Sequence, residues 1–430
     1  MVPRLILLLC TLALVLFGVV MIYSASSVSA LSEGSDPLDS LVSQLIFAGI
    51  GTCAALVVWK VIPLNLWRYD KVVWAVWVLM MLLLLLTAII GTANYGAQRW
   101  LYIGSASIQP SEFAKLAFIL MAVRCMSLYN EGALDLRNMV LYGGLGVAVP
   151  LAFLLVAQSD MGTTAICLVG IVSVLWLGGF PAKYVYAICG VAVLGLVLVI
   201  ALGAGYRSDR FLFLNPWNDG ENGQGAGYQL VHSYYALAGG GLTGLGLGNS
   251  HEKYLYLPFA DTDFIFAVVG EELGLVGAVA VIAVFLLFLY AGLQIARQAS
   301  DAFGGMVAGS FSIMIVFQAF LNIGCVIGVF PTTGKPLPFI SAGGSSLVAT
   351  MLMVGFILAV SEEAGKPSVH ERRRADFTLV RNNERSQARG QGHRAVRENV
   401  FSRAEARPAA SERLRAVRGG GTGSEERRRW

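Results

Sequence analysis

The chain has 430 residues and a formal net charge of +4; 56% of its residues are hydrophobic and only 13% are charged. Soluble globular chains carry roughly 25% charged residues, so this composition argues against that class and is typical of a polytopic membrane protein. The six cysteines lie in apolar runs without C-x-x-C spacing, which indicates buried thiols rather than a zinc site or a disulfide framework.

Apolar runs near the roughly 20 residues that cross a hydrocarbon core recur from Leu5 to Val360. The first run is too long for a signal peptide and lacks a clean A-x-A-like cleavage site, so it is expected to be the first spanning helix. The pattern predicts an all-α, polytopic integral membrane protein with about ten transmembrane helices. The expected spans are residues 4–26, 41–62, 71–91, 111–128, 138–157, 162–179, 183–203, 263–294, 305–329 and 343–361.

The basic residues of the connections set the expected orientation. With the N-terminus in the cytoplasm, the positive-inside rule is satisfied, and an even number of spans puts both termini on that side. The basic residues that then face the cytoplasm are Arg68, Lys71, Arg124, Arg137, Lys183 and Arg297. This orientation exports three polar connections, 92–110, 204–262 and 331–342, where chemistry is expected. The large loop 204–262 is long enough to be functional, and its aromatic residues predict packing on the membrane face.

The chain is expected to divide into a membrane domain, residues 1–361, and a cytoplasmic basic tail, residues 362–430. Low apolar content predicts that the tail is disordered. Its location and its few aromatic residues argue against nucleic acid. Anionic lipids would attract it, with a cytoplasmic partner as the alternative.

The first exported connection carries unusually many polar residues before an apolar run. Glu112 and Lys115 lie three apart on one helix face, so they can pair and enter the membrane edge together. A helix cap with a structural ion pair is the alternative. Arg99 beside Trp100 offers a cation and an interfacial aromatic for a lipid phosphate or a sugar.

The large loop supplies two cations, Arg207 and Arg210, and a glycine-rich run at residues 239–248. That run formally contains G-x-G-x-x-G, but no strand precedes it and it faces away from cytoplasmic nucleotides. Close helix packing or a flexible hairpin is the better interpretation.

Four carboxylates follow at the start of the eighth expected span. Asp261 is a natural N-cap, which leaves Asp263 in the first helical turn at the water interface. Asp263 has two interpretations, a functional carboxylate or simple dipole complementarity. Glu271 and Glu272 lie roughly 12 to 14 Å deeper and are either functional or structural carboxylates that hold neighbouring helices.

Residues 322–346 combine prolines and glycines with polar side chains at the outer surface. Irregular backbone at membrane depth survives only where it lines a cavity or is buried in protein. Exposed N–H groups with Lys335, Ser341, Ser345 and Ser346 are expected to form a cradle for an anionic headgroup.

These blocks together resemble the SEDS (shape, elongation, division and sporulation) family, which includes FtsW, RodA and SpoVE. Residues 322–346 carry the landmarks Asn-x5-Gly, Pro-x-x-Gly and Ser-x-Gly-Gly-Ser-Ser. The blocks Gly-Ala-x-x-Trp, Gln-Pro-Ser-Glu-Phe-x-Lys from Gln109, and Thr-Asp-Phe-Ile-Phe-Ala-x-x-Gly-Glu-Glu-Leu-Gly match as well. The resemblance covers about residues 5–361.

The resemblance implies a peptidoglycan glycosyltransferase in the bacterial cytoplasmic membrane, which polymerises lipid II on the outer face. It implies a class B penicillin-binding protein and other division-site membrane proteins as partners. It assigns catalysis to Asp263 and importance to Trp100. The common Leu-Pro-Glu-Ala-His-Thr-Asp loop has Phe259 and Asp261 in place of its Glu and His, whereas Asp160 of the Asp-x-Gly-Thr block is retained.

The chemistry is consistent with one carboxylate. Joining a sugar hydroxyl to an anomeric carbon that carries a polyprenyl diphosphate needs a general base and little acid assistance. Compensating charge would come from Arg207, Arg210 or Lys335, with a divalent cation (Mg or Mn) left open and no metal site predicted. A helix N-terminus would lower the pKa of Asp263, so burial or a carboxylate, Asp160 or Asp261, is expected to raise it.

Other functions are kept as alternatives. A lipid II flippase would use similar carboxylates, but its polar residues should line a path through the whole bilayer. A scaffold would not need so many polar residues at the outer mouth. Within the family, the long tail favours an FtsW-like protein at the division septum over a RodA-like elongation paralogue. The loop histidines His232 and His251 are expected to be structural rather than metal ligands.

Overall fold

The computed structural model describes residues 1–94, 97–103, 106–202 and 212–364. The chain divides into two units, Met1–Lys366 and Pro367–Trp430, and every described element belongs to the first. The predictions for the basic tail and for Arg207 and Arg210 lie outside the described residues.

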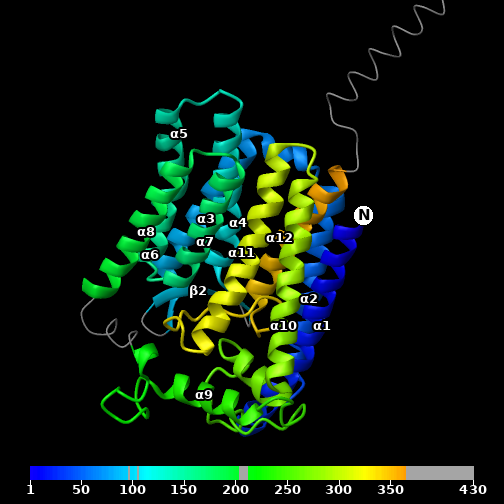
Figure 1. Ribbon diagram of the computed structural model, residues 1–430, viewed down its shortest axis with the longest axis vertical. Helices are drawn as coiled ribbons and strands as arrows, with labels where there is room; N and C mark the ends of the chain where they lie inside the picture. The colour runs from blue at the N-terminus through cyan, green and yellow to red at the C-terminus, as the bar shows by residue number, and fades with distance from the viewer. Residues whose placement is uncertain (95–96, 104–105, 203–211, 365–430) are drawn as a thin grey trace, which may run out of the picture. The chain divides into compact units, whose positions relative to one another are not determined.

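Helices dominate the first unit (Figure 1). They are α1 (Val2–Ser32), α2 (Asp39–Leu56), α3 (Asp70–Ile90), α4 (Pro110–Asn130), α5 (Leu136–Gly143), α6 (Val149–Val156), α7 (Met161–Leu177), α8 (Ala182–Leu202), α9 (Tyr228–Gly240), α10 (Ile265–Arg297), α11 (Ala302–Val326) and α12 (Gly344–Glu363). Short π-helical turns, η1 (Val57–Val61) and η3 (Gly144–Ala148), and a 3₁₀ helix, η2 (Leu64–Arg68), join some of them.

The prediction of an all-α, polytopic membrane protein is confirmed. Every expected span coincides with helical structure, and in the described part of the chain 7 helices are long and apolar enough to cross a membrane. The total of ten spans stays a prediction.

Local sequence explains where several helices begin. Pro110 opens α4, where its missing N–H leaves no bond unmade. Asp160 caps α7 by accepting a hydrogen bond from Thr163 N at 3.0 Å. Asp301 caps α11 in the same way, by accepting from Gly304 N at 3.0 Å. Pro150 cannot donate within its helix, and the π-helical turn η3 directly precedes its segment.

A kink divides α10 at Gly274, whose φ of 66° and ψ of −167° are not helical. The backbone N–H groups of Leu275 and Val276 bond to carbonyls of Gly241 and Leu242, at 2.9 and 3.1 Å. In return, the carbonyls of residues 271 and 272 accept from the N–H groups of residues 245 and 246. The glycine-rich run therefore serves close packing, and the hairpin interpretation is not needed.

The connection 92–110 contains short strands that the sequence analysis did not predict. It forms a small antiparallel sheet of order β1-β2-β3, with β1 (Thr92–Asn94), β2 (Ala97–Ile103) and β3 (Ala106–Ile108). Residues 92–108 contain β-branched and aromatic residues, which favour strands, between glycines and polar residues, which favour turns. The turn-forming residues masked the strand signal. The sheet brings Arg99 and Trp100 to the end of the helices.

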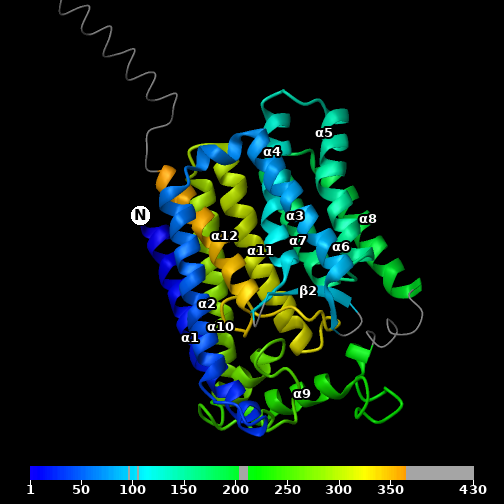
Figure 2. The ribbon, with the colours of Figure 1, turned by 180° about the vertical axis from the view of Figure 1, so that it is seen from behind.

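The long helices run side by side, and residues 212–264 with α9 gather at the same end as β2 (Figures 1 and 2). The two helices α11 and α12 are buried along most of their length. Helix α12 packs against α2 and α11, and α11 packs in turn against α7 and α10. The irregular segment between α11 and α12 lies at that same end, where the candidate site forms.

Candidate active site

Asp263 lies just before α10 and not in its first turn. The helix begins at Ile265 with Phe264 as N-cap, and no side chain caps it. The expected N-cap role of Asp261 is therefore wrong. Its carbonyl accepts from Ala342 N at 2.9 Å, and Asn322 Nδ2 binds the carbonyl of Asp263 at 2.8 Å, so this backbone is fixed by tertiary contacts.

The Asp263 carboxylate faces the backbone of Gly334. A Cβ placed on Gly334 would lie 3.6 Å from Oδ2 of Asp263, and the positive φ of Gly334, 64°, suits glycine. Burial raises the pKa of Asp263 to about 6, with a further contribution from Asp261 and opposition from Lys335. Burial or a carboxylate, Asp160 or Asp261, was expected to raise this pKa; burial is the main cause here, and Asp261 adds to it.

Lys335 connects the segment before α12 with α7 and α4. Its Nζ lies 2.9 Å from Oδ2 of Asp160 and 3.6 Å from Oε1 of Glu112. Burial by itself would lower the pKa of Lys335, but Asp160 and Glu112 raise it, so the ammonium keeps its proton.

Glu112 also binds Lys115, whose Nζ lies 2.8 Å from Oε2, so the predicted pair three residues apart is confirmed. Lys115 donates a second bond to Oε1 of Gln318 at 2.8 Å. All four ionisable side chains of this cluster are at most 1% exposed. Charges buried so completely persist only because they compensate each other.

Asp160 is the best-satisfied carboxylate of this cluster. Besides Lys335, it accepts from Thr163 N at 3.0 Å, Thr163 Oγ1 at 2.8 Å and Ser111 Oγ at 3.4 Å. Burial alone would raise its pKa, but Lys335, Arg99 and the N–H of Thr163 together hold that pKa well below the ordinary range. Asp160 is thus a permanent anion and a poor proton acceptor.

Arg99 does not present a free cation to a lipid phosphate. Its Nε donates to the carbonyl of Gln158 at 3.1 Å, and a second guanidinium nitrogen donates to the carbonyl of Ser159 at 2.7 Å. Ser159 has a positive φ of 51°, so Arg99 supports an unusual turn before α7. Trp100 is its partly exposed neighbour on β2.

Lys335 and the three serines that were expected to join exposed N–H groups in a cradle for an anionic headgroup are buried, and each side chain already has a hydrogen-bond partner. Ser341 Oγ donates to the carbonyl of Thr262 at 2.6 Å. Ser345 Oγ accepts from Gln109 N at 3.1 Å, and Ser346 Oγ lies 3.4 Å from Nε2 of Gln318. The serines hold neighbouring segments together.

Glu271 and Glu272 bind the large loop and α1. Glu272 accepts from Ser24 Oγ at 2.7 Å and pairs with Lys253 Nζ at 2.9 Å. Glu271 accepts from the hydroxyl of Ser250 and from His251 N at 2.8 Å. Of the two interpretations of these carboxylates, this geometry supports the structural one.

Sequence reasoning did not select several residues of the site. Asn322 and Gln318 lie in α11 and are 2% exposed, and Thr163 is fully buried. An amide in an apolar run is a usable signal, because polar side chains in membrane helices face the protein interior. Lys253, which is 4% exposed, had no comparable signal in its polar loop.

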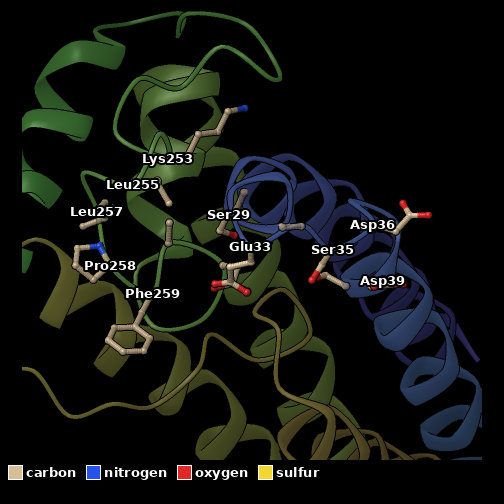
Figure 3. A pocket seen from close by; sticks show the side chains of 15 residues that line it. Ser29, Glu33, Ser35, Asp36, Asp39, Lys253, Leu255, Leu257, Pro258 and Phe259 are labelled. Atoms are coloured by element: carbon tan, nitrogen blue, oxygen red, sulfur yellow. The ribbon is translucent and has the colours of Figure 1, made fainter.

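A cavity of about 510 Å³ lies beside this site, with Asp261 in its wall (Figure 3). Residues at the end of α1 and the start of α2, including Glu33 and Asp39, line one side, and Leu255 and Phe259 line the other. Asp263 is not among its lining residues.

The described residues hold no group of three or more His, Cys, Asp or Glu side chains arranged for a metal ion. His232 instead pairs with Glu252, with Nδ1 2.6 Å from Oε2. Asp160 and Glu112 are already compensated by lysines.

The sequence matches the family model FTSW_RODA_SPOVE, described as cell cycle protein, over residues 4–366. It is 37% identical over 363 residues to stage V sporulation protein E of Bacillus subtilis, covering 84% of this chain and 97% of that protein. It is 39% identical over 359 residues to a probable peptidoglycan glycosyltransferase FtsW of Geobacter metallireducens, covering 83% and 94%.

Solved structures share the fold. The rod shape determining protein RodA of Thermus thermophilus superposes with a TM-score of 0.61 at 25% identity, covering 84% of this chain and 97% of that one. A chain from a peptidoglycan synthase complex superposes with a TM-score of 0.66 at 24% identity, covering 84% and 98%.

Proposed function

The chain belongs to the FtsW/RodA/SpoVE family of cell cycle proteins and is a multi-pass membrane glycosyltransferase of peptidoglycan synthesis; we propose that it polymerises lipid II with Asp263 as general base. One observation carries the proposal: burial raises the pKa of the Asp263 carboxyl to about 6, and this carboxyl lies beside Gly334, next to the buried Lys335–Asp160 pair. A base works best when its pKa is close to the operating pH.

The reaction then needs one proton transfer at the protein. The acceptor hydroxyl gives its proton to Asp263 while its oxygen forms the new bond to the anomeric carbon of the donor. The bond from that carbon to the diphosphate oxygen breaks, and the electron pair leaves with the polyprenyl diphosphate. Such a leaving group is already stable as an anion, so no acid is required.

The basic residues have two different proposed roles. Asp160 and Glu112 hold Lys335 and Lys115 through ion pairs, so these cations support the site rather than face solvent. Arg207 and Arg210 remain our candidates for the cations that compensate the diphosphate. Trp100 and Arg99 on β2 would border the sugar.

We place this activity at the outer face of the cytoplasmic membrane, with both termini inside, and at the division septum. Similarity to relatives named FtsW and stage V sporulation protein E supports division or sporulation over elongation. The fold shared with a chain from a peptidoglycan synthase complex agrees with a transpeptidase partner, for which a class B penicillin-binding protein is our candidate.

Reconstitution tests this proposal against a lipid II flippase. The full-length protein is placed in vesicles with fluorescent lipid II, with and without its penicillin-binding partner. Glycan chains that grow on the accessible face, resolved by electrophoresis, support polymerisation. Transfer of labelled lipid II between leaflets without chain growth would instead identify a transporter.

A further inference from the structure

Three consecutive backbone carbonyls just before α10 accept hydrogen bonds from residues that lie far away in the sequence. The carbonyl oxygens of residues 261, 262 and 263 accept, in that order, from Ala342 N at 2.9 Å, Ser341 Oγ at 2.6 Å and Asn322 Nδ2 at 2.8 Å. These donors lie at the end of α11 and in the segment before α12. The backbone that carries the base is thus held from outside its own helix.

Asn322 makes the most consequential of these contacts. Its Nδ2 donates to the carbonyl of Asp263 and also to the carbonyl of Lys335, each at 2.8 Å. Both partners are carbonyls, which only accept, so the nitrogen of the amide is fixed on this side. One side chain, 2% exposed, therefore joins the base to the segment that carries Lys335.

The other end of the amide is not satisfied. Among the described residues no donor reaches Oδ1 of Asn322, although that atom is buried. An unsatisfied buried acceptor opposes folding, so an asparagine is a poor choice here for stability alone. Its two donated bonds are what the site gains.

We propose that Asn322 is a positioning residue for the glycosyl transfer, which holds Asp263 and Lys335 in one fixed arrangement. This inference rests on the proposed role of Asp263 as base. In a continuous helix the carbonyl of Asp263 would accept from Ala267 N, which here bonds to Phe264 O at 2.9 Å. Asn322 competes for that carbonyl and so keeps α10 from extending back through the base.

Loss of the contact should therefore allow α10 to begin earlier. Asp263 would enter the first turn, where the helix dipole stabilises its anion and the carboxylate points elsewhere. The base would become both misplaced and more acidic. These two effects have separate signatures, in turnover and in the pH profile.

The test compares Asn322→Leu with Asn130→Leu. Leucine approximates the size of asparagine, lacks the donors and suits an apolar helix. Asn130 is the control for the loss of one interhelical amide bond, because its Nδ2 bonds to the carbonyl of Gly178 at 3.0 Å at an exposed position away from this site. Polymerisation of lipid II is measured across pH, and backbone hydrogen exchange is measured by mass spectrometry on the same samples.

We expect turnover of Asn322→Leu to fall roughly 10- to 100-fold with little change in KM, because a small misplacement of a reacting group is costly. The acid limb of its pH profile should move to lower pH. Backbone amides of residues 259–264 and 331–342 should exchange faster together. Asn130→Leu should match the wild type in all three measurements.

Wild-type turnover with unchanged exchange in Asn322→Leu would overturn the inference. If that variant does not fold, Asn322→Ala replaces it, since it removes the amide donors and adds no bulk; wild-type turnover there has the same meaning. Full activity of Asp263→Asn would refute the proposed base instead, and the hydrogen exchange of the Asn322 variants would still report on the contact itself.

Discussion

The ammonium of Lys335 lies 2.9 Å from Oδ2 of Asp160, and the two side chains are 1% and 0% exposed. The pair joins residues 175 positions apart and ties the segment before α12 to the start of α7. Because neither charge contacts solvent, each depends on the other for compensation. The pair is thus a point where stability and the site's geometry are coupled.

Replacing Lys335 with methionine should destabilise the protein strongly, since it leaves a buried anion with less compensation. Removing one partner of a buried pair typically costs about 3 to 5 kcal/mol. Thermal unfolding in detergent measures the effect. Lys60→Met is the control, because Lys60 and its partner Glu362 are 50% and 34% exposed, and such pairs contribute at most about 1 kcal/mol.

The double variant Lys335→Met with Asp160→Asn separates charge from packing. It removes the uncompensated anion, so it should be more stable than Lys335→Met alone. Equal melting temperatures for Lys335→Met and Lys60→Met would show that the buried pair contributes no more to stability than the exposed pair does.

Polymerisation should decline as the pH falls through about 6, because Asp263 accepts a proton only when ionised and its pKa is raised to about 6. The negative charge of Asp261 contributes to that rise. Asp261→Asn should therefore move the acid limb of the pH profile to lower pH. Asp36→Asn, which removes another carboxylate beside the cavity, should leave the limb in place.

An acid limb that does not respond to Asp261→Asn would mean that another group governs the pH dependence. Asp160 would not be that group, since its pKa is held far below this range.

Gly244→Ala should disrupt the junction between the glycine-rich run and α10. A Cβ at Gly244 would lie 2.2 Å from the carbonyl oxygen of Glu272, and its φ is +80°. Gly248→Ala is the matched control, because its φ of +83° carries a similar strain while nothing lies within 4 Å of the added Cβ. Strain alone costs about 1 to 2 kcal/mol.

Gly244→Ala should therefore lower the melting temperature more than Gly248→Ala does. Similar losses of melting temperature in the two variants would mean that position 244 requires glycine for its backbone conformation and not for the close approach of α10.

Hydropathy predicted the long helices well. The span expected at 71–91 is the helix Asp70–Ile90, and the one expected at 305–329 is Ala302–Val326. Membrane spans are legible because each must be continuously apolar over its own length. The start of α10 was not predictable in the same way. It depends on bonds from Asn322 and Ser341, which lie 59 and 79 residues from their partners.

The site was predictable only where its partners are close in sequence. Glu112 and Lys115 are three residues apart on one helix, and their pair was expected from that spacing. The partners of Lys335 and Arg99 come from other elements, and nothing local indicates that these cations are already bonded. The sequence therefore indicated which polar residues gather at the site. It did not indicate that Lys335 and Arg99 are bonded to groups of the protein and are not free to bind a ligand.

The most direct test of the account is the polymerisation of lipid II by purified Asp263→Asn, after its folding and its binding to the penicillin-binding partner are shown to match the wild type. Asparagine keeps the shape and cannot accept the proton. We predict a loss of at least about 100-fold in product, as expected for a general base, while Asp261→Asn assayed near neutral pH retains activity. Wild-type product from Asp263→Asn would contradict the account.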